Sequence, residues 1–230
     1  MMRQIVLVVP LICLAPGFCL LGSAEDSLTD LPVVYRDDFE SGASHWQPTD
    51  EKAWKIKQSG GEHGEVYSQF EKKSDYNPPH RSPFNIALLE DVTVGDLVLD
   101  VDVLSTHEDY GHRDVVVVFG YQDPAHFYYV HLGKQADDHA NQIFIVNDAP
   151  RTKISLTSTK GTDWNDEWHH VRVVRRTKTG EIEIYFDDVQ KPVMTAKDTH
   201  FLSGRVGLGT FDDTSDWDNF TLRGVKAEAK

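Results

Sequence analysis

Two consecutive segments near the C terminus decide the fold: Trp168-His-His-Val-Arg-Val-Val-Arg-Arg176 and Gly180-Glu-Ile-Glu-Ile-Tyr-Phe-Asp-Asp188. In the first segment Val171 and Val173 are separated by a polar residue, and in the second the isoleucines alternate with glutamates. Successive side chains of a β-strand point to opposite faces, so this period of two indicates strands with one buried face. We therefore predict a pair of adjacent antiparallel strands here.

Further segments along the chain have the same strand-like character. Val115–Phe119 is apolar on both faces, which is typical of a central strand in a sandwich. No stretch of twelve residues has helical periodicity, and regular strand spacing favours a β-sandwich. The chain is thus predicted to be all-β, with these additional strands: 33–39, 65–70, 84–89, 97–103, 127–132, 142–147, 154–156, 204–211 and 217–222.

The N terminus has the pattern of an export signal. Arg3 precedes an apolar stretch, Ile5–Leu21, and Gly22-Ser-Ala24 supplies small residues for cleavage. We predict a signal peptide over residues 1–24 and one domain over 25–230, secreted or held in the periplasm or cell envelope, without membrane insertion after cleavage. Both cysteines, Cys13 and Cys19, lie in the signal, so the mature domain has no disulfide.

The charge balance restricts the partners. The chain has 23 basic and 37 acidic residues, a net charge of −14. Binding of nucleic acid needs clustered lysine and arginine, so nucleic acid is not an expected partner. Polyanionic glycans are disfavoured for the same reason. A neutral polysaccharide or glycan remains the best match, although solubility alone also explains the charge.

The segments on either side of Asp123-Pro124 predict a β-hairpin. If Tyr121 pairs with His126, then Val118 lies opposite Tyr129, and Val116 lies opposite His131. This surface combines aromatic rings with polar groups, as a saccharide site requires. We expect it to be the open, concave face of the sandwich. The alternative is that Tyr129 and His131 are half-buried sheet residues.

The loop 106–114 enters this hairpin and is rich in histidine, carboxylate and aromatic side chains. It is either a solvated loop or a second source of glycan contacts, and a catalytic metal is a weaker alternative because tight ligand spacing is lacking. The predicted glycan-contact residues from the loop and the hairpin are Tyr110, His112, Arg113, Phe127, Tyr129 and His131.

The strand order and the sequence patterns of these strands resemble the concanavalin A-like lectin/glucanase jelly rolls, including laminin G-like domains, over residues 33–225. The chain also resembles in layout the exported 3-keto-disaccharide hydrolases, through Asp38-Phe39, Trp168-x-x-Val171 and Gly207-x-Gly209. It lacks the Asn-Ser-Gly segment of their central strand. If the resemblance extends to activity, His131, His112 and Asp114 are the acid–base candidates, because such groups need a tunable pKa in a cleft.

Acidic residues cluster at both ends of the domain. Pairing of the first and last strands, which the resemblance implies, would bring Asp37 and Asp38 close to Asp218. Calcium prefers such hard oxygen ligands, so a structural Ca²⁺ site is one interpretation. Surface acids and strand-end caps are the other, and we expect no cofactor to be required.

The glucanase catalytic pattern Glu-x-Asp-x-x-Glu is absent from Glu181–Phe186, which ends on phenylalanine. The sequence therefore predicts a secreted glycan-binding jelly roll without an evident catalytic signature. Two alternatives stay open: a glycan-active hydrolase of the 3-keto-disaccharide type, and a laminin G-like domain for protein interaction or envelope structure. A fold alone does not separate these functions.

Overall fold

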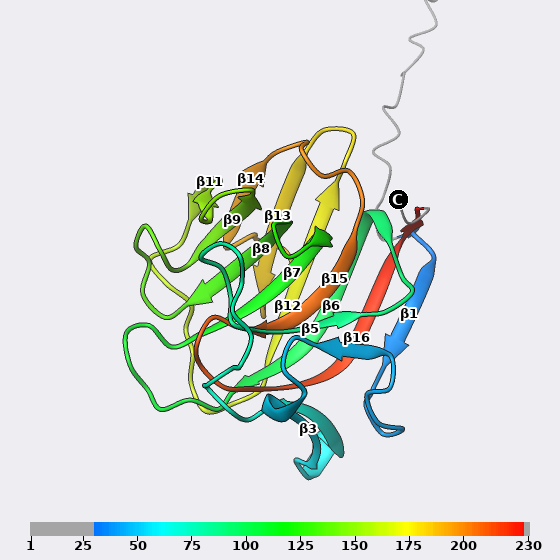
Figure 1. Ribbon diagram of the computed structural model, residues 1–230, viewed down its shortest axis with the longest axis vertical. Helices are drawn as coiled ribbons and strands as arrows, with labels where there is room; N and C mark the ends of the chain where they lie inside the picture. Colours follow the sequence, from blue (N-terminus) through cyan, green and yellow to red (C-terminus); the bar gives the residue numbers. More distant parts are fainter. Residues whose placement is uncertain (1–29, 228–230) are drawn as a thin grey trace, which may run out of the picture.

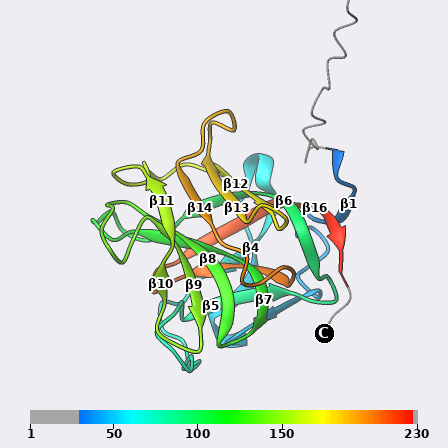
Figure 2. The ribbon, with the colours of Figure 1, turned by 90° about the horizontal axis from the view of Figure 1, so that it is seen from above.

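A computed structural model describes residues 30–227 and has two antiparallel β-sheets packed face to face (Figure 1). Seen from above, β12, β13 and β14 lie in one layer and β5, β7, β8 and β9 in the other (Figure 2). The predicted all-β jelly-roll sandwich is confirmed. The predicted signal peptide lies outside the described residues. Within residues 30–227, no helix has the length and apolar character needed to cross a membrane.

Sheet A has nine strands. Its first strand, β1 (Val33–Asp37), pairs with the last, β16, as the resemblance implies. The remaining order from edge to edge is β11 (Ser155–Ser158), β14 (Met194–Lys197), β13 (Glu181–Phe186), β12 (His169–Arg176), β6 (Val94–Ser105), β16 (Ser215–Lys226), β4 (Glu65–Gln69) and β3 (Trp54–Gln58).

Two single-turn 3₁₀ helices, Glu51–Ala53 and Gly61–His63, lie in loops. Sheet B has seven strands. Its order is β10 (Thr152–Lys153), β9 (Gln142–Asn147), β8 (His126–Gly133), β7 (Asp114–Asp123), β15 (Arg205–Thr210), β5 (Asn85–Leu89) and β2 (Trp46–Pro48). Four of the sixteen strands in the described range, β2, β3, β10 and β14, are not predicted by the sequence pattern, because each has five residues or fewer and gives only a short periodic signal.

The main core fills the space between the sheets. Val171, Val173, Ile182 and Ile184 are fully buried there, as the alternation predicts. Trp217 on β16 is also fully buried, whereas Trp168, which the sequence places in the core by analogy, lies outside it and is partly exposed. The core therefore has one of the two expected tryptophan anchors.

The β7–β8 hairpin has the predicted register. Val116 lies opposite His131, and Val118 lies opposite Tyr129. The turn differs, because Asp123 rather than Tyr121 pairs with His126, and the register shifts in between. Gly120, with φ +59°, lies within this shift in a left-handed conformation that glycine adopts easily.

The outer face of sheet B is buried rather than open. Phe127, Tyr129 and Phe144 are at most 1% exposed and form a second apolar cluster with neighbouring valines. The segment 70–84, between β4 and β5, lies over this face, and in Figure 1 it is the turquoise loop in front of β7 and β8. Its Pro78 and Ser82 are buried. We call residues 70–84 the covering segment.

A row of charged residues crosses the outer face of sheet A. His170 lies between two carboxylates, with Nε2 2.9 Å from Asp100 and Nδ1 3.0 Å from Asp102. Arg172 and Arg223 also donate to Asp100, at 2.7 and 3.1 Å. The hydrogen bonds to Asp100 and then Asp102 raise the pKa of His170 to about 9. The imidazole is therefore cationic at neutral pH.

We predict that this pairing makes stability fall between about pH 6.5 and 9. Because the folded-state pKa of His170 is raised, its contribution is complete below the unfolded value of 6.5 and is lost as pH rises through the folded value. The aspartates have pKa values lowered below 3.8 and do not titrate in this window. The side chain is 33% exposed, so screening limits the loss to about 1–2 kcal/mol.

Urea unfolding of the wild type and of His170→Asn at pH 6, 7.5 and 9 measures this effect. The wild type should lose the additional stability and the variant should not. Identical pH profiles for the two proteins would contradict the assignment.

Candidate functional site

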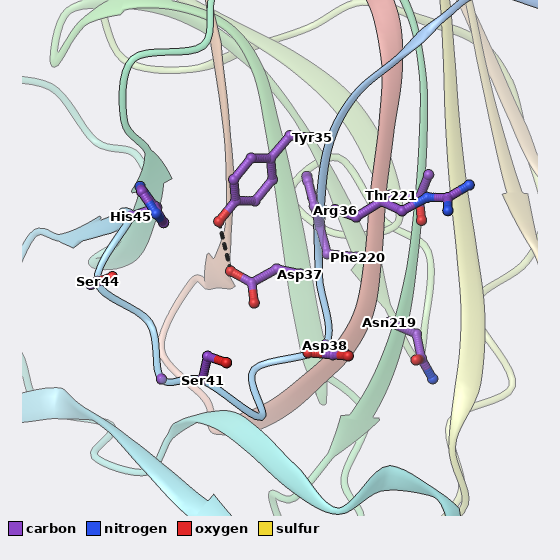
Figure 3. A pocket seen from close by; sticks show the side chains of 11 residues that line it. Tyr35, Arg36, Asp37, Asp38, Ser41, Ser44, His45, Asn219, Phe220 and Thr221 are labelled. Carbon is purple, nitrogen blue, oxygen red and sulfur yellow. Dashed lines mark hydrogen bonds between the residues drawn. The ribbon is translucent and has the colours of Figure 1, made fainter.

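An open pocket of about 600 Å³ lies where β1 meets β16 and the loop 38–45 (Figure 3). Its walls combine one tyrosine ring with hydroxyl, carboxylate, amide, imidazole and guanidinium groups. The lining residues are Tyr35, Arg36, Asp37, Asp38, Ser41, Gly42, Ser44, His45, Asn219, Phe220 and Thr221.

The Asp37 carboxylate organises one wall of this pocket. It accepts hydrogen bonds from the Tyr35 hydroxyl at 2.7 Å, from Trp46 Nε1 at 2.9 Å and from the Phe39 amide at 3.0 Å. Burial and then the bond to Asp37 raise the pKa of Tyr35 far above its usual value, so its hydroxyl stays protonated. Trp46 packs in the core, 5.0 Å from the Phe220 ring. Tyr35 is therefore fixed to the body of the sandwich.

The opposite wall comes from a tight return of the chain after β1. Phe39 has φ +56° and Gly42 has φ +89°, and the Gly42 amide donates to the Phe39 carbonyl at 3.0 Å. This turn brings Ser41, Ser44 and His45 opposite the strand, as Figure 3 shows. Within residues 30–227, the side chains of these three residues make no hydrogen bonds, so their polar groups are free for a ligand.

The sequence-predicted acid–base candidates are only partly brought together. His131 Nε2 lies 3.4 Å from Asp114 Oδ2, and both side chains are buried. His112 is exposed, unlike that pair, and its ring centroid lies 6.4 Å from that of Tyr110. The His131–Asp114 pair therefore lacks the access that a substrate would need in this conformation.

Asp213, one of the acids that precede the last strand, is a buried carboxylate that joins this cluster. It accepts from the Tyr110 hydroxyl at 2.8 Å and from the Asp114 amide at 2.9 Å. Burial and then the Asp114 charge raise the pKa of Asp213. The aspartate-rich segment that contains Asp213 has the composition of an ordinary polar loop. The sequence pattern alone therefore does not show that Asp213 is buried.

Four of the predicted glycan-contact residues are inside the molecule: Arg113, Phe127, Tyr129 and His131. Phe127 and Tyr129 lie in the second apolar cluster, and Arg113 is 1% exposed. The guanidinium of Arg113 donates to Ser105 and to the carbonyl of Asn165, which ties the 106–114 loop to the sandwich. The expected open concave face is therefore closed, and only Tyr110 and His112 of the predicted set are exposed.

Arg151 completes the cover over sheet B. Its Nη1 donates to the Tyr129 hydroxyl at 3.0 Å, and the guanidinium lies 4.8 Å from the Phe144 ring and 4.2 Å from the Phe211 ring. Its backbone amide donates to the Arg81 carbonyl of the covering segment at 3.1 Å. The aromatic face thus binds a cation supplied by the chain itself.

The residues considered for calcium make other contacts in this structure. Asp37 accepts the three hydrogen bonds described above, and Asp218 Oδ2 lies 2.7 Å from His63 Nδ1. Asp38 is exposed and accepts from the Glu40 amide. Over the described range 30–227, no three histidine, cysteine or acidic side chains are arranged to hold a metal ion.

Comparison with known proteins identifies the fold. No family model matches the chain, and no curated protein sequence matches it either. Among solved structures, the carbohydrate-binding module CBM66 from Bacillus subtilis is similar, with a TM-score of 0.55 and 17% identity over 78% of this chain and 96% of that chain.

Two further structures agree. Winged bean acidic lectin complexed with methyl-α-D-galactose has a TM-score of 0.55 and 14% identity, covering 84% of this chain and 98% of that chain. A Bacillus subtilis protein of unknown function with a galectin-like fold has a TM-score of 0.53 and 10% identity, covering 85% and 97%. The chain therefore has the same antiparallel jelly-roll β-sandwich fold as these structures.

We predict that Arg151→Ala lowers the free energy of unfolding by about 2 kcal/mol, because one hydrogen bond and two ring contacts are lost over a buried face. Urea unfolding at neutral pH measures this. Lys153→Ala is the matched control, since Lys153 is an exposed cation two residues away that pairs with Asp138. The control should stay within about 0.5 kcal/mol of the wild type. Equal effects of the two substitutions would contradict the covering role of Arg151.

Proposed function

We propose that this protein binds a glycan in the pocket between β1, the loop 38–45 and β16. The observation that carries the proposal is the composition of the pocket: a fixed tyrosine ring faces serine, histidine and aspartate side chains. An aromatic ring offers its face to sugar C–H groups, while hydroxyl, carboxylate and imidazole groups bond sugar hydroxyls. Ser41, Ser44 and His45 need no rearrangement of internal hydrogen bonds to do so.

The ligand in this proposal is neutral. The chain carries a net charge of −14, and the pocket wall presents two adjacent carboxylates, Asp37 and Asp38. Repulsion by these charges disfavours uronic acids and sulfated sugars. Similarity of fold to a carbohydrate-binding module and to a galactoside-bound lectin supports a glycan ligand. The pattern of residues 1–24 supports a role outside the cytoplasm, in a secreted or envelope-associated protein.

We expect His45→Ala and Asp38→Ala each to weaken glycan binding by about three- to tenfold, because each removes one or two hydrogen bonds to sugar hydroxyls. Both side chains are exposed, so the melting temperature should not change. Affinity electrophoresis in gels containing neutral polysaccharides, followed by calorimetric titration, measures the effect. His112→Ala is the matched control, an exposed histidine on the competing 106–114 loop.

The outcomes separate the competing functions. Loss of binding in His112→Ala with full binding in His45→Ala would move the site to the 106–114 loop. Release of product from the polysaccharide would favour the hydrolase, for which the sequence offers His131, His112 and Asp114 as acid–base candidates. A folded protein without retention or product would favour a protein-interaction domain.

A further inference from the structure

Trp168 is an aromatic residue that the core does not use. It directly precedes β12, is partly exposed and lies outside the main core cluster. Its ring stacks on the imidazole of His63 with centroids 3.8 Å apart and planes inclined by 19°. A tryptophan that a domain leaves partly in solvent on a flat polar face is a typical ligand-contact residue, because its large ring needs little ordering on binding.

The stack is held in place from below. His63 Nδ1 lies 2.7 Å from Asp218 Oδ2, and the Asp218 side chain is 3% exposed. Asp218 also accepts from the Asn219 amide at 2.7 Å. The two rings therefore form a fixed surface on the outer face of sheet A, which we call the Trp168–His63 platform.

This platform borders the proposed glycan pocket. Asn219 lines the pocket (Figure 3). Its Nδ2 donates to Asp102 Oδ2 on the outer face of sheet A at 2.9 Å. On the other side, Glu40 Oε1 accepts from the Glu65 amide at 2.8 Å, which ties the pocket loop to the turn that carries His63. Asp218, which holds His63, directly precedes Asn219, so this link and the Glu40–Glu65 contact together place the platform near the pocket rim.

The surface beyond Asn219 is polar and fixed. Asp102 bonds His170, which also bonds Asp100, so these groups are ordered without a ligand. Carboxylate and imidazole groups in such a network keep lone pairs or protons that sugar hydroxyls can share. The platform therefore continues into a row of hydrogen-bonding groups.

We propose that the Trp168–His63 platform is a second sugar-contact position, so that the protein takes an oligosaccharide chain that runs from the pocket over Asn219 onto sheet A. This inference rests on the proposed function and specifies its ligand class: a chain of several sugar residues rather than a single one. The pocket holds one part of the chain, and the stacked rings hold the next.

Calorimetric titration of the full chain with cello-, xylo-, arabino- and manno-oligosaccharides of one, three and six residues tests the inference. For the series that binds, the hexamer should bind the wild type about fivefold or more tightly than the monomer, the gain expected from one additional aromatic contact. Trp168→Ala should remove this gain and leave the monosaccharide affinity unchanged. Trp168→Phe should keep part of the gain in affinity from monomer to hexamer, and His112→Ala should keep all of this gain.

Affinity that does not depend on chain length would overturn the second contact position while the pocket proposal stands. A length-dependent gain that survives in both Trp168→Ala and His63→Ala would also overturn the second contact position. Absence of binding at every length in all four series would overturn both proposals. His63 lies in the 3₁₀ turn before β4, apart from Trp168 in the sequence, so its variant keeps the test valid if Trp168→Ala does not fold.

Discussion

Sheet B has two apolar faces, and a two-layer sandwich buries only one of them. Val117 and Val130 point into the main core, while Val116 and Tyr129 point to the other side and would meet water without further cover. The chain covers that side with its own residues 70–84 and with the guanidinium of Arg151. This constraint closes the face on which the sequence places a ligand, and it leaves the edge of the sandwich as the open, polar surface.

Strand β16 connects the two halves of the proposed site. Its register to β6 shifts between Asp218 and Thr221, and Asn219 at the shift has φ +50°. As a result Phe220 packs in the core, Asn219 lines the pocket and Asp218 supports His63 on the outer face of sheet A. The side chains of a regular strand alternate strictly between two faces. The irregularity therefore allows three adjacent side chains to lie in three different environments.

The fold follows from the sequence wherever burial is periodic. The alternation of Val171 and Val173 and the facing pairs of the β7–β8 hairpin are examples, because a one-residue slip would exchange core and surface. The cover over sheet B cannot be predicted in this way. The covering segment is rich in proline, serine and lysine and reads as a surface loop, and its burial depends on contacts to Arg151 and Phe211 from distant parts of the chain.

The candidate site is predictable only in part for the same reason. Asp37 and Asp38 stand out in the sequence as acids after a strand, which suggests a cation. One of the donors that bond Asp37 is Trp46, nine residues away, and the sequence pattern does not show this contact. Trp168 resembles a core anchor by position, and only the contact with His63 shows that it lies on the outer face. Pockets and platforms formed by loops lack the periodicity on which sequence interpretation depends.

The central claim is that ligands bind at the β1–β16 edge and not on the outer face of sheet B. Amide hydrogen exchange of the full chain, with and without the tightest-binding oligosaccharide, tests it most directly. The account predicts slower exchange on binding in residues 36–45 and 218–221, with residues 71–82 and 127–131 unchanged. Slower exchange in the 106–114 loop, or faster exchange of the covering segment on binding, would contradict it.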